Sequence, residues 1–501
     1  MSPKSNRKSD ELRSADDWRR QRLLAHPPPV HPGRSRTAAS FQSPRTLRVA
    51  VFLLVALAAS LLTGVALTRL DPIFIGGAVA ALLCVYIIVM HPFVGLVLYT
   101  AAFLLHPGLI YPVLAPLHLE RVIGVLALAG MFLQQHRESR RISLDWRPQT
   151  RYFLILLILI AASIPFAYWR SAAVDGLIDF LKLAAWYFLV VHLVNTRRRL
   201  RIYLAVFLVL VCYSGFAAFT DYLAGKSVYS QGIDRAHGLT GTLGGANALG
   251  AEMTVTIPIL LALTFCREAR WFRLGSVIAV VLLTMTMVVS GSRSALVGLC
   301  GALLFMWWHS GNRLLAGLVG AMIIAVGAQF IPEQYVERYG TMFQDELDGS
   351  SRGRVVLWQK GVRMIADRPL TGVGIKCFGT ANALAYSPPG RPSYMVSHNL
   401  FFQVPAEIGI PGAIVFFLFL RAVFQTSRAT KRKLVDARSS WGIELALVRG
   451  LAAGFVALLI TGFFGGNFYR YTWYVYAAFN CAVARILETE ASDPGTSGAP
   501  P

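Results

Sequence analysis

Three side chains that suit chemistry on a phosphorylated substrate stand next to long apolar segments. Arg293 lies in a short polar turn, Arg354 lies four residues before Trp358 on a predicted helix, and His398 begins another apolar segment. A guanidinium offers a rigid fork of donors that matches phosphate oxygens, and a neutral imidazole can accept a proton near pH 7. Two arginines and a histidine would therefore suit transfer from a diphosphate-linked donor to a hydroxyl group.

Each of these residues also has a simpler structural explanation. Arg293 could be a snorkelling anchor at the membrane surface, and Arg354 a solvated charge above the Trp358 ring. His398 could cap a helix or sit at the membrane interface as an ordinary polar residue. The sequence gives no distances between the three residues, so both explanations stay open at this stage.

Two further polar residues fall inside the apolar segment 242–265, namely Asn247 and Glu252. A carboxylate within a membrane is costly and usually faces protein or a water-filled cavity. Glu252 could be the structural partner of a nearby arginine or a protonated carboxyl, or it could belong to the functional site. The sequence favours neither the structural nor the functional interpretation of Glu252.

The elements that position these residues follow from the distribution of apolar residues. The chain has 501 residues, of which 55% are hydrophobic, and a mean hydropathy of +0.53. The apolar residues come in blocks of about twenty, the length of a helix that crosses a bilayer, and do not alternate as in a barrel strand. We therefore predict an all-α polytopic membrane protein with about 12–14 transmembrane helices. The predicted spans lie near residues 47–67, 73–90, 93–112, 119–134, 151–169, 173–194, 201–223, 242–265, 272–290, 294–309, 313–331, 399–421, 446–465 and 470–487.

The basic residues set the predicted orientation. The net charge is +22, and the strongly basic short loops all fall on one side of the membrane when the N-terminus is inside. This is the positive-inside bias, and it also argues against nucleic-acid binding, because the charge is spread over loops. We predict a multi-pass protein of the bacterial inner membrane with both termini cytoplasmic, carrying disordered tails at residues 1–46 and 488–501.

One long loop, residues 332–398, is predicted to be periplasmic and to carry short helices. The stretch 353–366 places Val355, Trp358, Val362 and Ile365 at helical spacing, so one face of this helix should be apolar. A Gly-rich turn and then a Gly- and Pro-rich stretch lead on to His398. Long loops with internal structure are often functional, and we expect this helix to lie on the outer membrane surface.

Four segments resemble the O-antigen ligase and polymerase superfamily of membrane glycosyltransferases. Residues 239–250 are similar to its Gly-x-x-x-x-x-Asn span start, and residues 290–295 to its Ser-x-Ser-Arg turn. Residues 354–374 are similar to its Arg-x-x-x-Trp helix with Arg-Pro-Leu-x-Gly-x-Gly, and residues 398–412 to its His-Asn segment with Glu-x-Gly-x-x-Gly. The order and spacing of these segments around one external loop make the combination specific. We assign residues 201–487 to a domain of this type and residues 47–200 to a separate N-terminal transmembrane region.

The resemblance implies a site and a reaction. The donor would be a glycan on undecaprenyl diphosphate, Arg293 and Arg354 would contact the diphosphate, and His398 would act on the acceptor hydroxyl. The supporting residues are expected to be Asn399, Glu407, Trp358, Asn247 and Glu252. We expect inverting transfer on the periplasmic face without a metal ion or other cofactor, because the predicted outer face holds no Asp-x-Asp motif.

The acceptor stays open in this interpretation. A ligase would use lipid A-core, an O-antigen or exopolysaccharide polymerase another lipid-linked glycan, and related enzymes use protein hydroxyls. Ligase is the first choice. Two rival classes are a membrane transporter, which Glu252 permits, and a non-catalytic scaffold of the cell envelope. Besides membrane lipids and these glycans the sequence indicates no partner, and it gives no oligomeric state.

Overall fold

The computed structural model describes residues 72–138, 145–238, 245–266, 270–314, 317, 333–340, 349–436 and 442–492. The predicted tail 1–46, the predicted span 47–67 and most of the predicted span 313–331 lie outside these residues. The chain divides into two compact units, Met1–Val79 and Ala80–Pro501. The helices from α4 onward, and with them every candidate site residue, belong to the second unit.

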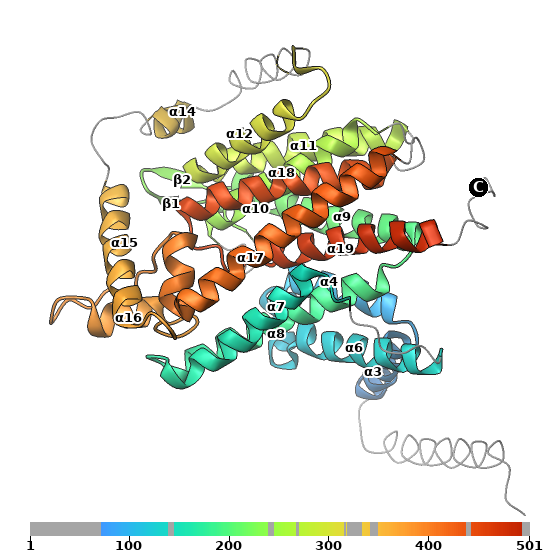
Figure 1. Ribbon diagram of the computed structural model, residues 1–501, viewed down its shortest axis with the longest axis horizontal. Helices are drawn as coiled ribbons and strands as arrows, with labels where there is room; N and C mark the ends of the chain where they lie inside the picture. The colour runs from blue at the N-terminus through green and yellow to red at the C-terminus, as the bar shows by residue number, and fades with distance from the viewer. Residues whose placement is uncertain are drawn as a thin grey trace, which may run out of the picture. The chain divides into compact units, whose positions relative to one another are not determined.

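Almost all of the described chain is helical, which confirms the all-α class (Figure 1). Short 3₁₀ turns occupy Pro112–Leu117 and Ile164–Phe166, and one antiparallel hairpin pairs β1 (Val228–Ser230) with β2 (Ile233–Arg235). The helices are α3 (Pro72–Met90), α4 (Pro92–Leu105), α5 (Pro107–Ile110), α6 (Leu119–Arg137), α7 (Pro148–Ser163), α8 (Arg170–Leu193), α9 (Arg197–Leu223), α10 (Ala246–Thr264), α11 (Arg270–Val289), α12 (Arg293–Trp308), α14 (Glu333–Gly340), α15 (Gly349–Asp367), α16 (Phe378–Ala385), α17 (Leu400–Asp436), α18 (Gly442–Phe464) and α19 (Tyr471–Ser492).

Each predicted span that falls within the described residues coincides with one of these helices. Seven of the described helices are long and apolar enough to cross a membrane by themselves. Others are shorter or more polar: α12 has 16 residues, and α8 contains four charged residues. The predicted span 93–112 is too long, because α4 stops before Pro107 and its C-cap, His106, is left-handed. At the other terminus α19 runs to Ser492, so residues 488–492 of the predicted disordered tail are helical.

The connections gather at two opposite ends of the bundle, as alternating spans require. At the end that carries His398, the Arg368 guanidinium donates to the carbonyl of Phe166 at 2.6 Å, which joins two of the predicted external loops. At the other end, which we call the basic end, Arg197 pairs with Glu490 at 2.6 Å and Arg201 with Glu444 at 3.3 Å. The predicted cytoplasmic loops therefore lie together, and acidic residues of α18 and α19 balance part of their charge.

The core lies where α10, α17, α18 and α19 pack together (Figure 1). Helix α19 contributes several aromatic side chains, of which Trp473, Tyr474 and Tyr476 are fully buried. Small residues allow the helices to approach closely: a Cβ at Gly450 of α18 would lie 2.5 Å from the Ile259 Cα of α10. Helix α12 packs against α18 and α10, and this contact fixes where Arg293 begins its helix.

Candidate functional site

Helix α15 is held against α17 mainly by Trp358. The indole Nε1 donates to the Ser397 carbonyl at 3.1 Å, immediately before His398. The ring stacks on Phe402 with centroids 5.7 Å apart and meets Phe463 edge-on at 5.6 Å. Trp358 therefore ties the loop helix to the start of α17 and the end of α18. This explains why a tryptophan follows Arg354 by one helical turn.

The docked face of α15 overlaps the predicted apolar face in part, since Trp358 and Ile365 belong to both. Leu357, Gly361 and Met364 are buried, whereas Val355 and Val362 are exposed. The prediction identified the apolar face from the spacing of apolar residues. The docked side also includes Gly361, the residue with the smallest side chain, which faces Phe402. A Cβ at Gly361 would lie 3.3 Å from the Phe402 Cβ, so a larger residue here would require Phe402 to shift by a few tenths of an ångström. The exposed valines leave an apolar strip at the edge of the docked face, beside Trp358 and Ile365.

His398 lies between α15 and α17, half-buried and in the left-handed backbone region with φ 47°. Burial lowers the pKa of the His398 imidazole, and the positive charge of Arg354 lowers this pKa further. The imidazole is therefore neutral near pH 7 and able to accept a proton. The structure thus brings Arg354 close enough to His398 for electrostatic coupling, which the sequence could not show.

Asn399 caps the helix that follows His398. It is fully buried, and its Oδ1 accepts from the backbone N–H of Phe401 at 2.8 Å. The Ser397 hydroxyl donates to the Asn399 carbonyl at 3.1 Å, closing a small turn around His398. The expectation that Asn399 supports the local geometry fits these contacts. The capped turn explains why the two residues occur side by side in the sequence.

Helix α17 is broken at Gly409, and the loop after α15 fills the break. Gly409 has φ 74° and ψ 173°, a conformation open almost only to glycine. The Pro369 carbonyl accepts from the Ile410 N–H at 2.7 Å, and the Val373 N–H donates to the Ala406 carbonyl at 2.8 Å. The Arg-Pro-Leu-x-Gly-x-Gly segment and the Glu-x-Gly-x-x-Gly segment are therefore the two sides of one contact.

Glu407 supports this contact from within. Its carboxylate is buried and accepts a hydrogen bond from the Tyr469 hydroxyl. The same hydroxyl accepts from the Lys376 backbone N–H at 2.9 Å, and the Gly374 N–H donates to the Glu407 carbonyl at 3.0 Å. Glu407 thus joins α17, the loop after α15 and the segment between α18 and α19. These contacts fit a supporting role.

Arg293 begins α12 and follows a tightly held turn. Its N-cap, Ser292, makes no capping hydrogen bond with its side chain. The preceding carbonyls of Ser290 and Gly291 accept from Arg235 at 2.7 Å and from Arg338 at 2.6 Å. Sequence reasoning missed both arginines. The available signal was the one used for Arg293, namely an arginine on the predicted outer side against the positive-inside trend.

Asn247 and Glu252 lie on the same helix but have different partners. Asn247 Oδ1 accepts from the Arg235 guanidinium at 2.7 Å, so Asn247 belongs to the surroundings of the Arg293 turn. Glu252 is fully buried, accepts from the Tyr471 hydroxyl and lies 3.8 Å from Arg470. This matches the structural alternative for Glu252, a carboxylate beside an arginine. Among the residues that the structure describes, no group of three or more His, Cys, Asp or Glu side chains could hold a metal ion.

The C-terminal part of α18 links the two arginine positions. Thr461 lies against Gly298, which is just over one turn along α12 from Arg293. Two residues later Phe463 contacts Trp358, one turn along α15 from Arg354. The C-terminal end of α18 therefore contacts both α12, which begins with Arg293, and α15, which carries Arg354. This arrangement offers two guanidinium groups and one neutral imidazole at one end of the bundle.

Comparison with known proteins agrees with this geometry. A family model described as O-antigen ligase matches residues 278–417, which run from α11 into α17 and include Arg293, Arg354 and His398. The resemblance to the O-antigen ligase and polymerase superfamily is confirmed. An O-antigen polymerase from Salmonella muenchen is 25% identical over 255 residues, which cover 49% of this chain and 62% of that relative. One comparison names a ligase and the other a polymerase, so they support the superfamily without separating its two activities.

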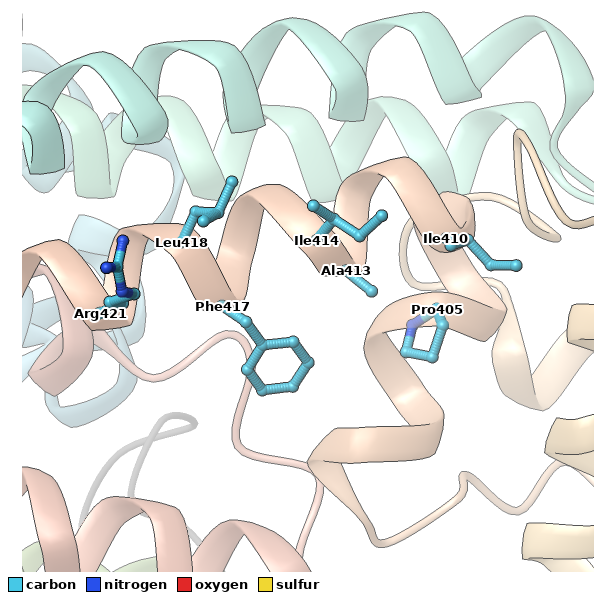
Figure 2. A pocket seen from close by; sticks show the side chains of 7 residues that line it. All are labelled: Pro405, Ile410, Ala413, Ile414, Phe417, Leu418 and Arg421. Carbon is cyan, nitrogen blue, oxygen red and sulfur yellow. The ribbon is translucent and has the colours of Figure 1, made fainter.

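An apolar groove follows α17 through the segment that matches the O-antigen ligase family. It has a volume of about 390 Å³ and starts beside the break at Gly409 (Figure 2). Figure 2 shows Pro405 on the short helical part before the break and Phe417 reaching toward the same space from the part after it. The lining residues are Pro405, Ile410, Ala413, Ile414, Phe417, Leu418 and Arg421. Its apolar walls suit a hydrocarbon chain.

Proposed function

We propose that this protein is a membrane glycosyltransferase that moves a glycan from undecaprenyl diphosphate to an acceptor hydroxyl. The observation that carries the proposal is the coupling of Arg354 to His398, on segments that Trp358 fastens together. A cation suited to phosphate and a neutral base thereby lie within electrostatic range of each other. The match of residues 278–417 to the O-antigen ligase family supports the same reaction class.

The proposed step is an inverting displacement at the anomeric carbon. The acceptor oxygen forms a bond to this carbon while the bond from the carbon to the diphosphate oxygen breaks. The acceptor proton passes to the neutral imidazole of His398, and the electron pair leaves with the lipid diphosphate. Arg293 and Arg354 stabilise the charge that grows on this leaving group, and such preorganised charges are usually the largest contribution to catalysis.

The groove along α17 gives the donor lipid a place to lie. Pro405 follows His398 by seven residues, which is about 10 Å along a helix. A diphosphate near His398 could therefore extend its prenyl chain past Pro405 toward Phe417, between apolar side chains. The lining carries one charged residue, Arg421, at the end away from the site. The reaction would take place on the periplasmic face of the bacterial inner membrane.

The acceptor would be lipid A-core if the protein is a ligase and another lipid-linked glycan if it is a polymerase. We favour ligase, with polymerase as the alternative. The test supplies lipid-linked oligosaccharide and each acceptor separately to membranes that contain wild-type protein or His398→Ala. Transfer by wild type alone supports the proposal, and the productive acceptor separates ligase from polymerase. Equal transfer by His398→Ala would contradict the role of this residue. No transfer to any acceptor by folded wild type would contradict the enzyme proposal and favour a transporter or a scaffold.

A further inference from the structure

The turn before Arg293 is held by residues from two other segments of the chain. Helix α11 ends here, and the last carbonyls of a helix have no partners within the helix itself. The last two carbonyls of α11 accept hydrogen bonds from outside the helix: Val288 from the Tyr339 hydroxyl of α14 at 3.3 Å, and Val289 from the N–H of Ala236, which follows β2, at 2.9 Å. The next two carbonyls, just after the helix, accept from two arginines: Ser290 from Arg235 at 2.7 Å and Gly291 from Arg338 at 2.6 Å. The backbone that leads into Arg293 is therefore fixed from outside the two helices that it joins.

The guanidinium shape allows Arg235 and Arg338 to bridge several segments at once. Arg235, which is 3% exposed, reaches the Ser290 carbonyl through Nε and Asn247 of α10 through Nη2 at 2.7 Å. Arg338 reaches the Gly291 carbonyl through Nε and the Gln231 carbonyl of the hairpin through Nη1 at 3.0 Å. A lysine ammonium has no planar fork and cannot reproduce these paired directions. Geometry as well as charge is therefore required at both positions.

The three arginines meet different electrostatic surroundings. Arg235 and Arg338 lie at the C-terminal end of α11, where the helix dipole favours a cation. Arg293 lies at the N-terminal end of α12, where the dipole favours an anion and adds to the positive potential of the side chain. Burial lowers the pKa of Arg235 to about 10, and the charges of Arg338 and Arg293 contribute to this lowering. The gathered like charges favour an anionic ligand on the Arg293 side of the turn.

We propose that Arg235 and Arg338 are positioning residues for Arg293: by fixing the carbonyls of Ser290 and Gly291, they aim the Arg293 guanidinium and the start of α12 at the donor diphosphate. This inference rests on the proposed function, since it assigns the anion to the donor. Arg235 is too buried to touch a substrate, so its effect passes through the turn. The hairpin and α14 thereby become parts of the site, although neither lies beside His398 in the sequence.

The test is a set of coupled substitutions read by the binding of a prenyl diphosphate. Farnesyl diphosphate is titrated into purified protein in lipid nanodiscs, for wild type, Arg235→Lys, Arg338→Lys, Arg293→Ala and the two double variants that combine a lysine with Arg293→Ala. The matched control is Arg391→Lys, which changes an exposed arginine in the same external loop. Each single lysine variant should bind about tenfold more weakly, and neither should weaken binding further in the Arg293→Ala background. Arg391→Lys should bind as wild type does.

Thermal unfolding of the same samples separates positioning from folding. A lysine variant that unfolds near the wild-type temperature and still binds weakly supports the inference. Wild-type affinity for farnesyl diphosphate in both lysine variants would overturn the inference. It would also be overturned if each lysine weakened binding as much in the Arg293→Ala background as it does alone, because residues that act through Arg293 should not have additive effects. Glycan transfer by wild type is measured in parallel. Absence of that transfer would overturn the proposed function whatever the binding data show, whereas transfer without coupling would overturn the positioning role alone.

Discussion

At the scale of single residues, Arg354 has two effects that work in the same direction. Its charge suits a diphosphate, and the same charge lowers the pKa of the neighbouring His398. In the proposed reaction a base must be unprotonated before it can accept the acceptor proton, so the cation would keep the imidazole neutral and would also contact the leaving group. The two functions of this arginine can be separated by their dependence on pH.

We predict that Arg354→Gln moves the acid limb of the pH–rate profile to higher pH. Loss of the positive charge removes one cause of the lowered pKa, so the pKa of His398 rises toward its ordinary value of 6.5. A higher pKa means that His398 becomes protonated, and inactive as a base, at a higher pH. The measurement is kcat/KM for glycan transfer from pH 5 to pH 8, in which the variant should also be slower at every pH.

The control for this prediction is Arg352→Gln, which removes an exposed charge two residues earlier on the same helix. The causes of the lowered His398 pKa are burial and Arg354, so the profile of Arg352→Gln should keep its acid limb. An unchanged limb in Arg354→Gln would mean that His398 is not the titrating base. A shift of equal size in both variants would mean that the pH of the acid limb depends on the overall surface charge and not on Arg354 in particular.

Glu252 should matter for stability rather than for the reaction. Its carboxylate is fully buried beside Tyr471 and Arg470, and removal of one partner leaves the other charge without compensation. We expect Glu252→Ala to destabilise the protein by about 3 kcal/mol and Glu252→Gln to cost less, because the amide keeps an oxygen for Tyr471. Thermal unfolding in detergent measures both variants. A loss of transfer in a Glu252→Gln protein of normal stability would instead place Glu252 in the functional site.

At the scale of elements, the break in α17 receives the loop that follows α15, and this contact joins the two helices that flank His398. A Cβ at Gly409 would stand 2.3 Å from the Leu370 carbonyl oxygen, and the backbone conformation is itself costly for any other residue. We predict that Gly409→Ala pushes the loop after α15 off α17 and reduces transfer at least tenfold. The strained backbone alone accounts for about 1–3 kcal/mol of lost stability, and the clash adds to this.

Gly390→Ala is the matched control for this substitution. Gly390 also has a positive φ, 75°, but a Cβ there would meet nothing within 4 Å. It should therefore lose stability from backbone strain while glycan transfer per folded molecule stays near the wild-type rate. Equal losses of transfer in the two alanine variants would show that the contact between the loop and the break is unimportant.

The groove along α17 permits a separate test of the donor lipid. Ala413 is one of its smallest lining residues, and Ala413→Phe would fill part of the space. We predict a rise of about tenfold in the KM for the long-chain donor, with little change for a donor that carries a short prenyl chain. The comparison of the two donors is the measurement. An equal rise for both donors would place the prenyl chain elsewhere.

The sequence predicted the elements better than it predicted their contacts. Period and length were enough to locate α15, yet Val355 and Val362 face outward, because docking depends on the small Gly361 opposite Phe402. The Gly-rich segment after α15 was interpreted as a turn. Its contact with the break in α17 joins residues that are distant in sequence, and the spacing within either segment carries no information about the other.

At the scale of the whole molecule, the same division between local and distant information holds. Blocks of apolar residues and basic loops predicted the helical class and the two ends of the bundle, because both depend on local composition. The two residues that bond the turn before Arg293, Arg235 and Arg338, come from two separate segments, the β1–β2 hairpin and α14. Their meeting depends on how four helices pack, so only the fold could bring them into the site.

The predicted orientation of the bundle can be tested with two introduced cysteines. Arg391 and Asp436 are both exposed and lie at opposite ends of α17. Arg391 precedes the first residue of the helix, and Asp436 is its last residue. If the basic loops face the cytoplasm, a membrane-impermeant maleimide should label Arg391→Cys once the outer membrane is permeabilised. Asp436→Cys should react only after the inner membrane is also opened, since the inner membrane bars the reagent. Labelling of the unsubstituted protein, which has six cysteines of its own, is subtracted. The reverse order would place His398 on the cytoplasmic face, where a periplasmic transfer reaction could not use it.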